Sequence, residues 1–111
     1  MVMTAENWKT QIRKGYLELC VLMLIRRHER LYGFEIVEKF SKASLEVKEG
    51  TLYPLLNRMA ADGQLKTVWE TENLKGHPRK FYSLTKSGEK FLLEMTEEFD
   101  QMVQVYRHLL K

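Results

Sequence analysis

Apolar residues recur every three to four positions along most of the chain, which predicts a mainly helical protein. A first helix is expected over residues 5–28, with Thr4 as its N-cap. Its first half carries one apolar stripe and its second half is apolar on most sides, so it should start amphipathic and end surrounded by protein. The stripe consists of Trp8, Ile12, Tyr16, Leu19 and Met23.

A short second helix is expected over residues 33–42, after a turn at residues 31–33. Acidic and basic residues alternate in it with Phe34, Ile36, Val37 and Phe40, which we expect to face inward.

The third predicted helix, residues 49–62, separates into two faces and ends at Asp62-Gly63. One face is apolar and consists of Leu52, Leu55, Leu56 and Met59. The other carries small groups, a hydroxyl, an amide and a guanidinium, with a phenol at its border. Such groups contact base edges and phosphates in DNA grooves, although this segment alone suits an ordinary polar face equally well. The residues are Gly50, Thr51, Tyr53, Pro54, Asn57 and Arg58.

The period then changes to that of a strand. Apolar and polar residues alternate over residues 65–71, and residues 79–84 form a second short run after a loop with Gly76 and Pro78. These runs predict a β-hairpin over residues 65–84. Its tip is basic, which suits a phosphate or minor-groove contact, and we assign Lys75, His77, Arg79 and Lys80 to DNA binding.

A last helix is expected from residue 85 to the C-terminus. Its apolar residues follow a heptad spacing over six successive positions, which favours a dimer helix over intramolecular packing alone. The expected dimer interface comprises Leu92, Met95, Phe99, Met102, Val103, Tyr106 and Leu109.

Helix, helix, helix and hairpin is the order of a winged helix-turn-helix, whose third helix enters the major groove. The predicted fold is therefore mainly α with a small β-hairpin. Residues 1–84 would form the DNA-binding domain, and residues 85–111 the long C-terminal dimerisation helix.

Composition limits the other classes of function. The net charge is +3, and residues 89–111 are acidic in excess, so a polyanion would be bound by one surface. Cys20 is the single cysteine, and it is interpreted as a small buried thiol. No spacing of His, Cys and carboxylates predicts a metal site, and no phosphate loop or activated nucleophile is found, so we expect no cofactor and no enzymatic activity. The N-terminus lacks a signal peptide and no apolar run is long enough to span a membrane, which predicts a cytoplasmic protein.

The sequence also resembles the PadR-type transcriptional regulators. The resemblance rests on Leu31–Ile36, on the Gly-Thr-Leu-Tyr-Pro motif within Glu49–Met59, and on Arg79–Gly88, with a Leu-Thr-x-x-Gly junction. It extends from about Ile12 to the C-terminus, and the single C-terminal helix is similar to the short subfamily. It implies a bacterial homodimeric repressor that binds a palindromic operator, is released by a small effector, and uses a C-terminal helix that packs on the partner's first helix.

Two positions bear on how the third helix begins. Lys48 occupies the place where the family commonly has a polar capping residue, so either another group caps the helix or Lys48 contacts a phosphate. Pro54 predicts that the regular helix begins late, since proline is tolerated in a first turn and not in an interior.

An apolar effector cavity along the dimer axis is a further hypothesis, and a filled core without a ligand is the equal alternative. A small hydrophobic or phenolic compound would contact Trp8, Ile12, Met95, Phe99 and Met102. A winged-helix module that binds only protein remains the alternative function, and the salt dependence of DNA binding would distinguish the two.

Overall fold

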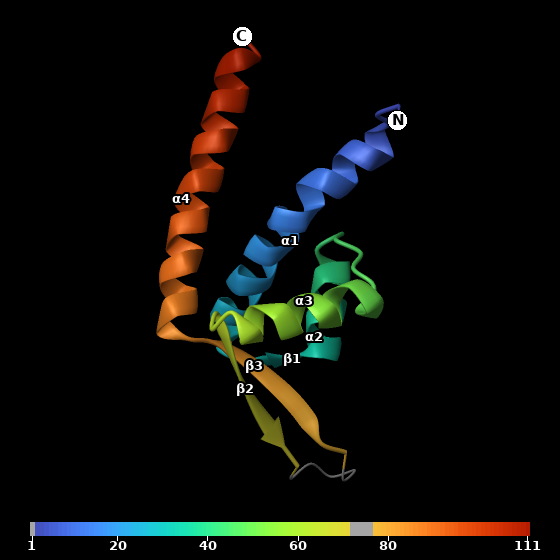
Figure 1. Cartoon of the computed structure of the whole chain (residues 1–111), viewed down its shortest axis with the longest axis vertical. Helices are drawn as coiled ribbons and strands as arrows, with labels where there is room; N and C mark the ends of the chain where they lie inside the picture. The colour runs from blue at the N-terminus through green and yellow to red at the C-terminus, as the bar shows by residue number, and fades with distance from the viewer. Residues whose placement is uncertain (1, 72–76) are drawn as a thin grey trace.

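A computed structural model describes residues 2–71 and 77–111 of the chain. The described elements follow the order α1 (Ala5–His28), β1 (Leu31–Tyr32), α2 (Gly33–Lys42), α3 (Glu49–Ala61), β2 (Leu65–Glu70), β3 (Arg79–Leu84) and α4 (Lys86–Leu109). Figure 1 shows the two strands of the hairpin extending from one end of the molecule, and α1 and α4 diverging toward the other end. The described chain is a winged helix-turn-helix with a long C-terminal helix.

Helix α1 spans the residues that the sequence predicts. The Thr4 side chain caps it by accepting a hydrogen bond from the Asn7 N–H at 3.1 Å. Burial begins at Leu17 and continues through Ile25, but Met23 stays exposed, so the second half is not enclosed on every side. The stripe that begins at Trp8 is also largely exposed, with Leu19 as its one buried member.

Residues 31 and 32, interpreted from sequence as a turn, form strand β1. Leu31 pairs with Tyr82 and Tyr32 with Phe81, so the described strands form a three-stranded antiparallel sheet in the order β1-β3-β2. The predicted hairpin is confirmed by the antiparallel pairing of β2 and β3, whereas the predicted turn was wrong at residues 31 and 32 because two residues are too few to show a strand period. Only the partner strand, some fifty positions later in the chain, makes this segment a strand.

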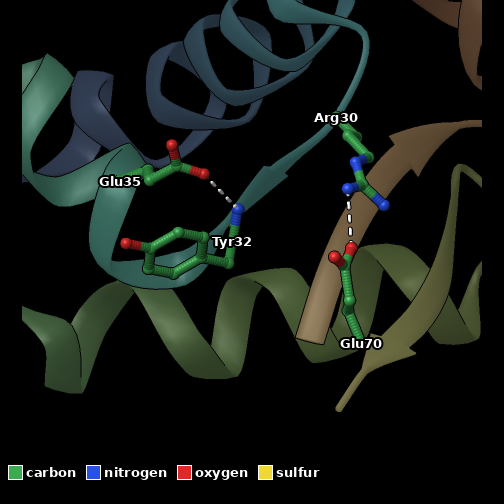
Figure 2. Close-up of polar contacts among 4 residues, drawn as sticks. All are labelled: Arg30, Tyr32, Glu35 and Glu70. Carbon is green, nitrogen blue, oxygen red and sulfur yellow. Dashed lines mark hydrogen bonds and ion pairs between the residues drawn. The ribbon is translucent and has the colours of Figure 1, made fainter. Parts of the chain in front are cut away.

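Helix α2 begins at Gly33, and the Glu35 carboxylate accepts a hydrogen bond from the Tyr32 N–H at 3.1 Å, as Figure 2 shows. Ile36 and Phe40 are buried as predicted, but Phe34 is 46% exposed, which corrects the prediction that it faces inward. Phe34 stands two residues before Ile36, about 200° around the helix, so the two cannot share a face.

The apolar face of α3 lies in the core: Leu52, Leu56 and Met59 are fully buried. The helix ends at Ala61, one residue earlier than predicted, because Asp62 is its C-cap and Gly63 takes a positive φ of 81°. Pro54 lies inside this helix, so the prediction of a late start was wrong. Proline removes the hydrogen bond to the Gly50 carbonyl, and that residue is exposed, so water can satisfy the carbonyl instead.

An ion pair braces the sheet on the side of the hairpin. The Arg30 guanidinium stacks 4.0 Å from the centroid of the Phe81 ring and reaches the Glu70 carboxylate at 2.6 Å. Figure 2 shows Arg30 extending from the chain before β1 toward Glu70 at the end of β2. The pair therefore connects the first edge of the sheet with the second across β3.

Helix α4 begins at Lys86, because Thr85 serves as its N-cap and accepts from the Gly88 N–H at 2.9 Å. Leu92 near its start is buried, and Phe99 at mid-helix contacts Tyr16 of α1 with the ring centroids 6.0 Å apart. Figure 1 shows α1 and α4 diverging toward the N- and C-termini, and the apolar residues of α4 after Phe99 are mostly exposed. Across the described ranges, no helix is both long and apolar enough to cross a membrane.

Candidate DNA-binding surface

The outer face of α3 presents the side chains that the sequence singles out. Thr51, Pro54, Asn57 and Arg58 are exposed, and Tyr53 lies at the border. Because the buried residues of α3 fix the rotation of the helix, this face is held toward solvent. It can therefore enter a groove without rearrangement of the core.

Lys48 is the N-cap residue of α3, and its side chain makes no capping hydrogen bond. Its carbonyl accepts from the Thr51 and Leu52 N–H groups, each at 2.9 Å, which continues the helical pattern. The Lys48 side chain therefore caps none of the first-turn N–H groups of α3. An exposed ammonium beside the positive end of a helix gives this corner a positive potential.

Arg58 is engaged by two carboxylates, which the sequence did not indicate. Its guanidinium lies 3.2 Å from Glu18 of α1 and 3.1 Å from Asp62 at the end of α3. The Arg58 side chain is 50% exposed, whereas that of Glu18 is 16% exposed. The guanidinium is thus anchored on its protein side and still accessible to an anion from solvent.

Tyr53 connects the outer face of α3 with the start of α2. A Cβ atom at Gly33 would overlap the Tyr53 ring, so the two residues are in close contact. Burial, and secondarily the charge of Glu49, raises the pKa of Tyr53 above its ordinary value of 10.0. The phenol therefore remains a hydrogen-bond donor through the neutral range.

The wing cations differ in their surroundings. Arg79 is exposed and stacks 4.8 Å from the centroid of the Tyr32 ring, and His77 is also exposed. Lys80 is half-buried, with its ammonium 5.9 Å from the Trp69 ring and 5.6 Å from the Tyr82 ring. Lys75, predicted to bind DNA with them, lies outside the described residues.

Three further residues at this end of the molecule were missed from sequence. Val68 and Trp69 leave large apolar side chains exposed on β2, and Arg30 braces the wing. The alternation of apolar and polar residues predicted a strand over residues 65–71. It did not indicate that the side chains of Val68 and Trp69, which point to opposite faces of the strand, would both be exposed. The role of Arg30 depends on a contact forty positions away and has no local signal.

Residues 21–94 match the Transcriptional regulator PadR-like family. The chain belongs to this family. Among similar solved structures is a PadR-like transcription factor from Bacteroides fragilis, 42% identical, with a TM-score of 0.79 over 93% of this chain and 98% of the other. A PadR-like transcriptional regulator from Bacillus cereus is 32% identical, with a TM-score of 0.80 over 91% and 97% of the two chains.

A curated relative from Mycobacterium tuberculosis, described as a transcriptional regulator, is 31% identical over 74 residues, or 67% of each chain. The protein is accordingly a PadR-family transcriptional regulator, a class that acts through DNA, and is not an enzyme. Within residues 2–71 and 77–111, no group of three or more His, Cys, Asp or Glu side chains could hold a metal ion.

The residues assigned to a PadR dimer interface fall into two groups. Leu92 is 7% exposed and Met95 packs against the core of the same chain, so the prediction that the seam is one continuous interface needs correction at its start. The reason is the length of α4, whose first turns cover its own domain. Farther along, Met102 is 62% exposed and Leu109 is 76% exposed. Val103 is half-buried and Tyr106 is exposed.

The residues predicted to bind an effector are divided between α1 and α4. Trp8 and Ile12 are exposed on α1, while Phe99 and Met102 are exposed on α4. Met95 is half-buried and packs against the core of its own chain. Phe99 contacts Tyr16 of the same chain. Tyr16 and Phe99 meet across the open angle between the two helices, whereas Ile12 also lines a hollow beside residues 44–46.

Proposed function

We propose that this PadR-family regulator is a homodimeric repressor that binds a palindromic operator and is released by a small hydrophobic or phenolic effector. The observation that carries the proposal is the combination of two faces on one chain: the polar outer face of α3 and the unpaired apolar faces of α1 and α4. The first suits a DNA groove, and the second suits another copy of the same chain.

Dimerisation is supported by the exposed apolar side chains of α4. Met102, Tyr106 and Leu109 follow a heptad spacing and are each more than half exposed. A soluble monomer rarely exposes such a continuous apolar row. Pairing with the exposed stripe of α1 on a second protomer would cover both surfaces, and we assign residues 85–111 this role.

Each protomer would insert α3 into a major groove, with the two helices about 34 Å apart, one turn of B-DNA. Asn57 and Thr51 offer hydrogen bonds to base edges, and Arg58 can reach a guanine or a phosphate. Lys48 and the wing cations would hold the backbone. A dimer that covers an operator in this way would block access of RNA polymerase, which makes repression the expected sign of regulation.

The effector is assigned to the apolar angle between α1 and α4. Met102 and Phe99 can repack around planar ligands at low energetic cost. Trp8 lies on this face, whereas Trp69 lies on the wing, so the two tryptophans of the chain report on different sites. With Trp69 replaced by Phe, quenching of Trp8 by planar apolar compounds would support the site. No change with any such compound, in a dimer that still binds DNA, would contradict it.

The test of the proposal is selection of genomic DNA fragments by the purified protein, followed by anisotropy titrations of the selected site at increasing salt. An operator should contain two symmetric half-sites. If about six phosphates are contacted, affinity should fall by roughly 1,000-fold between 50 and 200 mM salt. Failure to enrich any symmetric sequence would contradict the operator assignment.

A further inference from the structure

The more buried of the two carboxylates at Arg58 belongs to α1. Glu18 stands between Leu17 and Leu19, which are both buried, so the packing of α1 fixes its backbone. The Glu18 side chain is largely buried, and its Oε1 lies 3.2 Å from Nη2 of Arg58. Within residues 2–71 and 77–111, Glu18 forms no second ion pair. The Arg58 guanidinium is therefore the cation that balances this carboxylate.

The second carboxylate at Arg58 is held less firmly. Asp62 accepts a hydrogen bond from Nη1 of Arg58 at 3.1 Å, and its side chain is about as exposed as that of Arg58. An exposed pair of this kind separates at little cost, because water replaces each partner. Glu18 is mostly out of water, so removal of its cation would leave a poorly hydrated charge. The guanidinium therefore stays at Glu18 even where its contact with Asp62 is given up.

Arg58 keeps enough free donors to contact a base while it stays at Glu18. A guanidinium carries several N–H donors, and Asp62 accepts one of them. The O6 and N7 atoms of guanine in the major groove accept two parallel hydrogen bonds from such a group. Because half of the Arg58 side chain is exposed, its remaining donors can be offered to a base from a fixed position.

A guanidinium held in one place is a poor partner for DNA of the wrong sequence. Binding to such DNA depends on cations that reach phosphates in any register. While it is paired with Glu18, Arg58 cannot follow a shifted phosphate, and the carboxylate offsets part of its charge. Glu18 should therefore weaken contacts with phosphates more than a contact with one correctly placed guanine.

We propose that Glu18 is a positioning residue that sets the sequence specificity of DNA binding. By holding Arg58, it lowers the affinity for DNA without an operator more than the affinity for the operator itself. This inference rests on the proposed function, since it requires that Arg58 contacts DNA. It assigns a role in specificity to a side chain of α1, which does not belong to the surface that we propose to bind DNA.

The variant Glu18→Gln tests the proposal, because it removes the charge and nearly keeps the size of the side chain. Anisotropy titrations compare the selected operator with a fragment of the same length whose half-sites are scrambled. We expect the affinity for the scrambled fragment to rise by about fivefold or more, and that for the operator to change less than about twofold. The slope of log affinity against log salt for the scrambled fragment should steepen by about one, as one more phosphate is contacted. An unchanged affinity for the scrambled fragment would overturn the proposal.

Two controls separate the action of Glu18 through Arg58 from a general change of charge. Glu94→Gln makes the same change at an exposed position of α4 and should alter both affinities less than about twofold. In an Arg58→Ala background, Glu18→Gln should likewise have less than about a twofold effect on the scrambled fragment. A full rise in that background would overturn the proposal, because Glu18 would then act without Arg58.

Thermal unfolding identifies a variant that has not folded. Glu18→Met, which is similarly long and uncharged, then replaces Glu18→Gln with the same expected outcome. If the protein bound no DNA at all, the proposed function and the role of Glu18 would fail together. If it bound a symmetric operator, but neither uncharged variant raised the affinity for the scrambled fragment, the proposed function would stand and the role of Glu18 alone would fail.

Discussion

Arg58 combines two tasks on one side chain. Glu18 and Asp62 hold the guanidinium from the protein side, and the same group is half exposed on the face of α3 that we propose to bind DNA. Exposed ion pairs contribute little to stability, about 0–1 kcal/mol each. The two ion pairs therefore fix the position of the Arg58 guanidinium and contribute little to the stability of α3.

Substitution of Arg58 by Ala should weaken operator binding by about tenfold or more, because a charged contact to DNA is lost. The dimer should remain intact, since Arg58 lies away from the apolar faces of α1 and α4. Anisotropy titration and sedimentation measure the two properties. Lys90→Ala, which removes an exposed cation from α4, is the matched control and should retain the affinity. Equal affinities of the two variants for DNA would show that the outer face of α3 does not belong to the DNA-binding surface.

Gly33 is required by its contact with Tyr53. A methyl group there would meet the aromatic ring, so Gly33→Ala should lower the free energy of unfolding by about 1–3 kcal/mol. Gly15→Ala is the control, because nothing lies within 4 Å of the added carbon and α1 gains a better helix former. That variant should be more stable by about 0.5–1 kcal/mol. Urea unfolding compares them, and a similar loss in both would refute the contact.

Cys20 should react slowly with alkylating reagents. Burial raises the pKa of its thiol above the ordinary 9.0, and a hydrogen bond from Tyr16 lowers it by less. The reactive thiolate therefore forms only at higher pH, and the rate with iodoacetamide should still be rising beyond pH 9. The same thiol in the chain unfolded by urea should level off earlier. A Cys20 rate that levels off before this control would contradict the assignment.

At the scale of elements, periodicity predicts what is local and misses what is distant. The bounds of α1 and α2 follow from apolar spacing and flanking polar residues, and they agree with the sequence-based ranges. Strand β1 could not be predicted from apolar spacing, because it forms only by pairing with β3. The outer face of α3 was read from spacing alone, whereas the anchoring of Arg58 by Glu18 joins residues forty positions apart.

The brace between Arg30 and Glu70 is expected to order the wing without adding much to global stability. Arg30→Met keeps an apolar stem over Phe81 but removes the ion pair, so the unfolding free energy should change by no more than about 1 kcal/mol. Amide exchange in β2 should nevertheless accelerate. Lys66→Met, on the same strand and exposed, serves as the control. Unchanged exchange in both variants would show that the wing does not depend on the brace.

At the scale of the whole molecule, the divergence of α1 and α4 leaves apolar surface that one chain cannot cover (Figure 1). Met102→Glu should dissociate the dimer, because a carboxylate would be buried without a partner. Gln101→Glu adds the same charge at the adjacent exposed position, about 100° around the helix and outside the heptad row, and should leave the dimer intact. Light scattering measures the mass of each variant. A dimer that persists in Met102→Glu would place the interface elsewhere.

The joint at the start of α4 has a mechanical consequence. The Thr85 N–H donates to the Gln64 carbonyl at 3.1 Å and its hydroxyl donates to the Gly63 carbonyl at 2.6 Å, while Gly88 lies directly against the backbone of Gln64. The base of α4 is thus fastened to the end of α3. Over 24 residues, a change in tilt of about 10° would displace the far end by roughly 6 Å, more than the rise of about 3.4 Å per base-pair step. In the proposed dimer, a loosened joint would therefore change the distance between the two α3 helices, whereas a firm joint fixes the spacing of the half-sites that the dimer can bind.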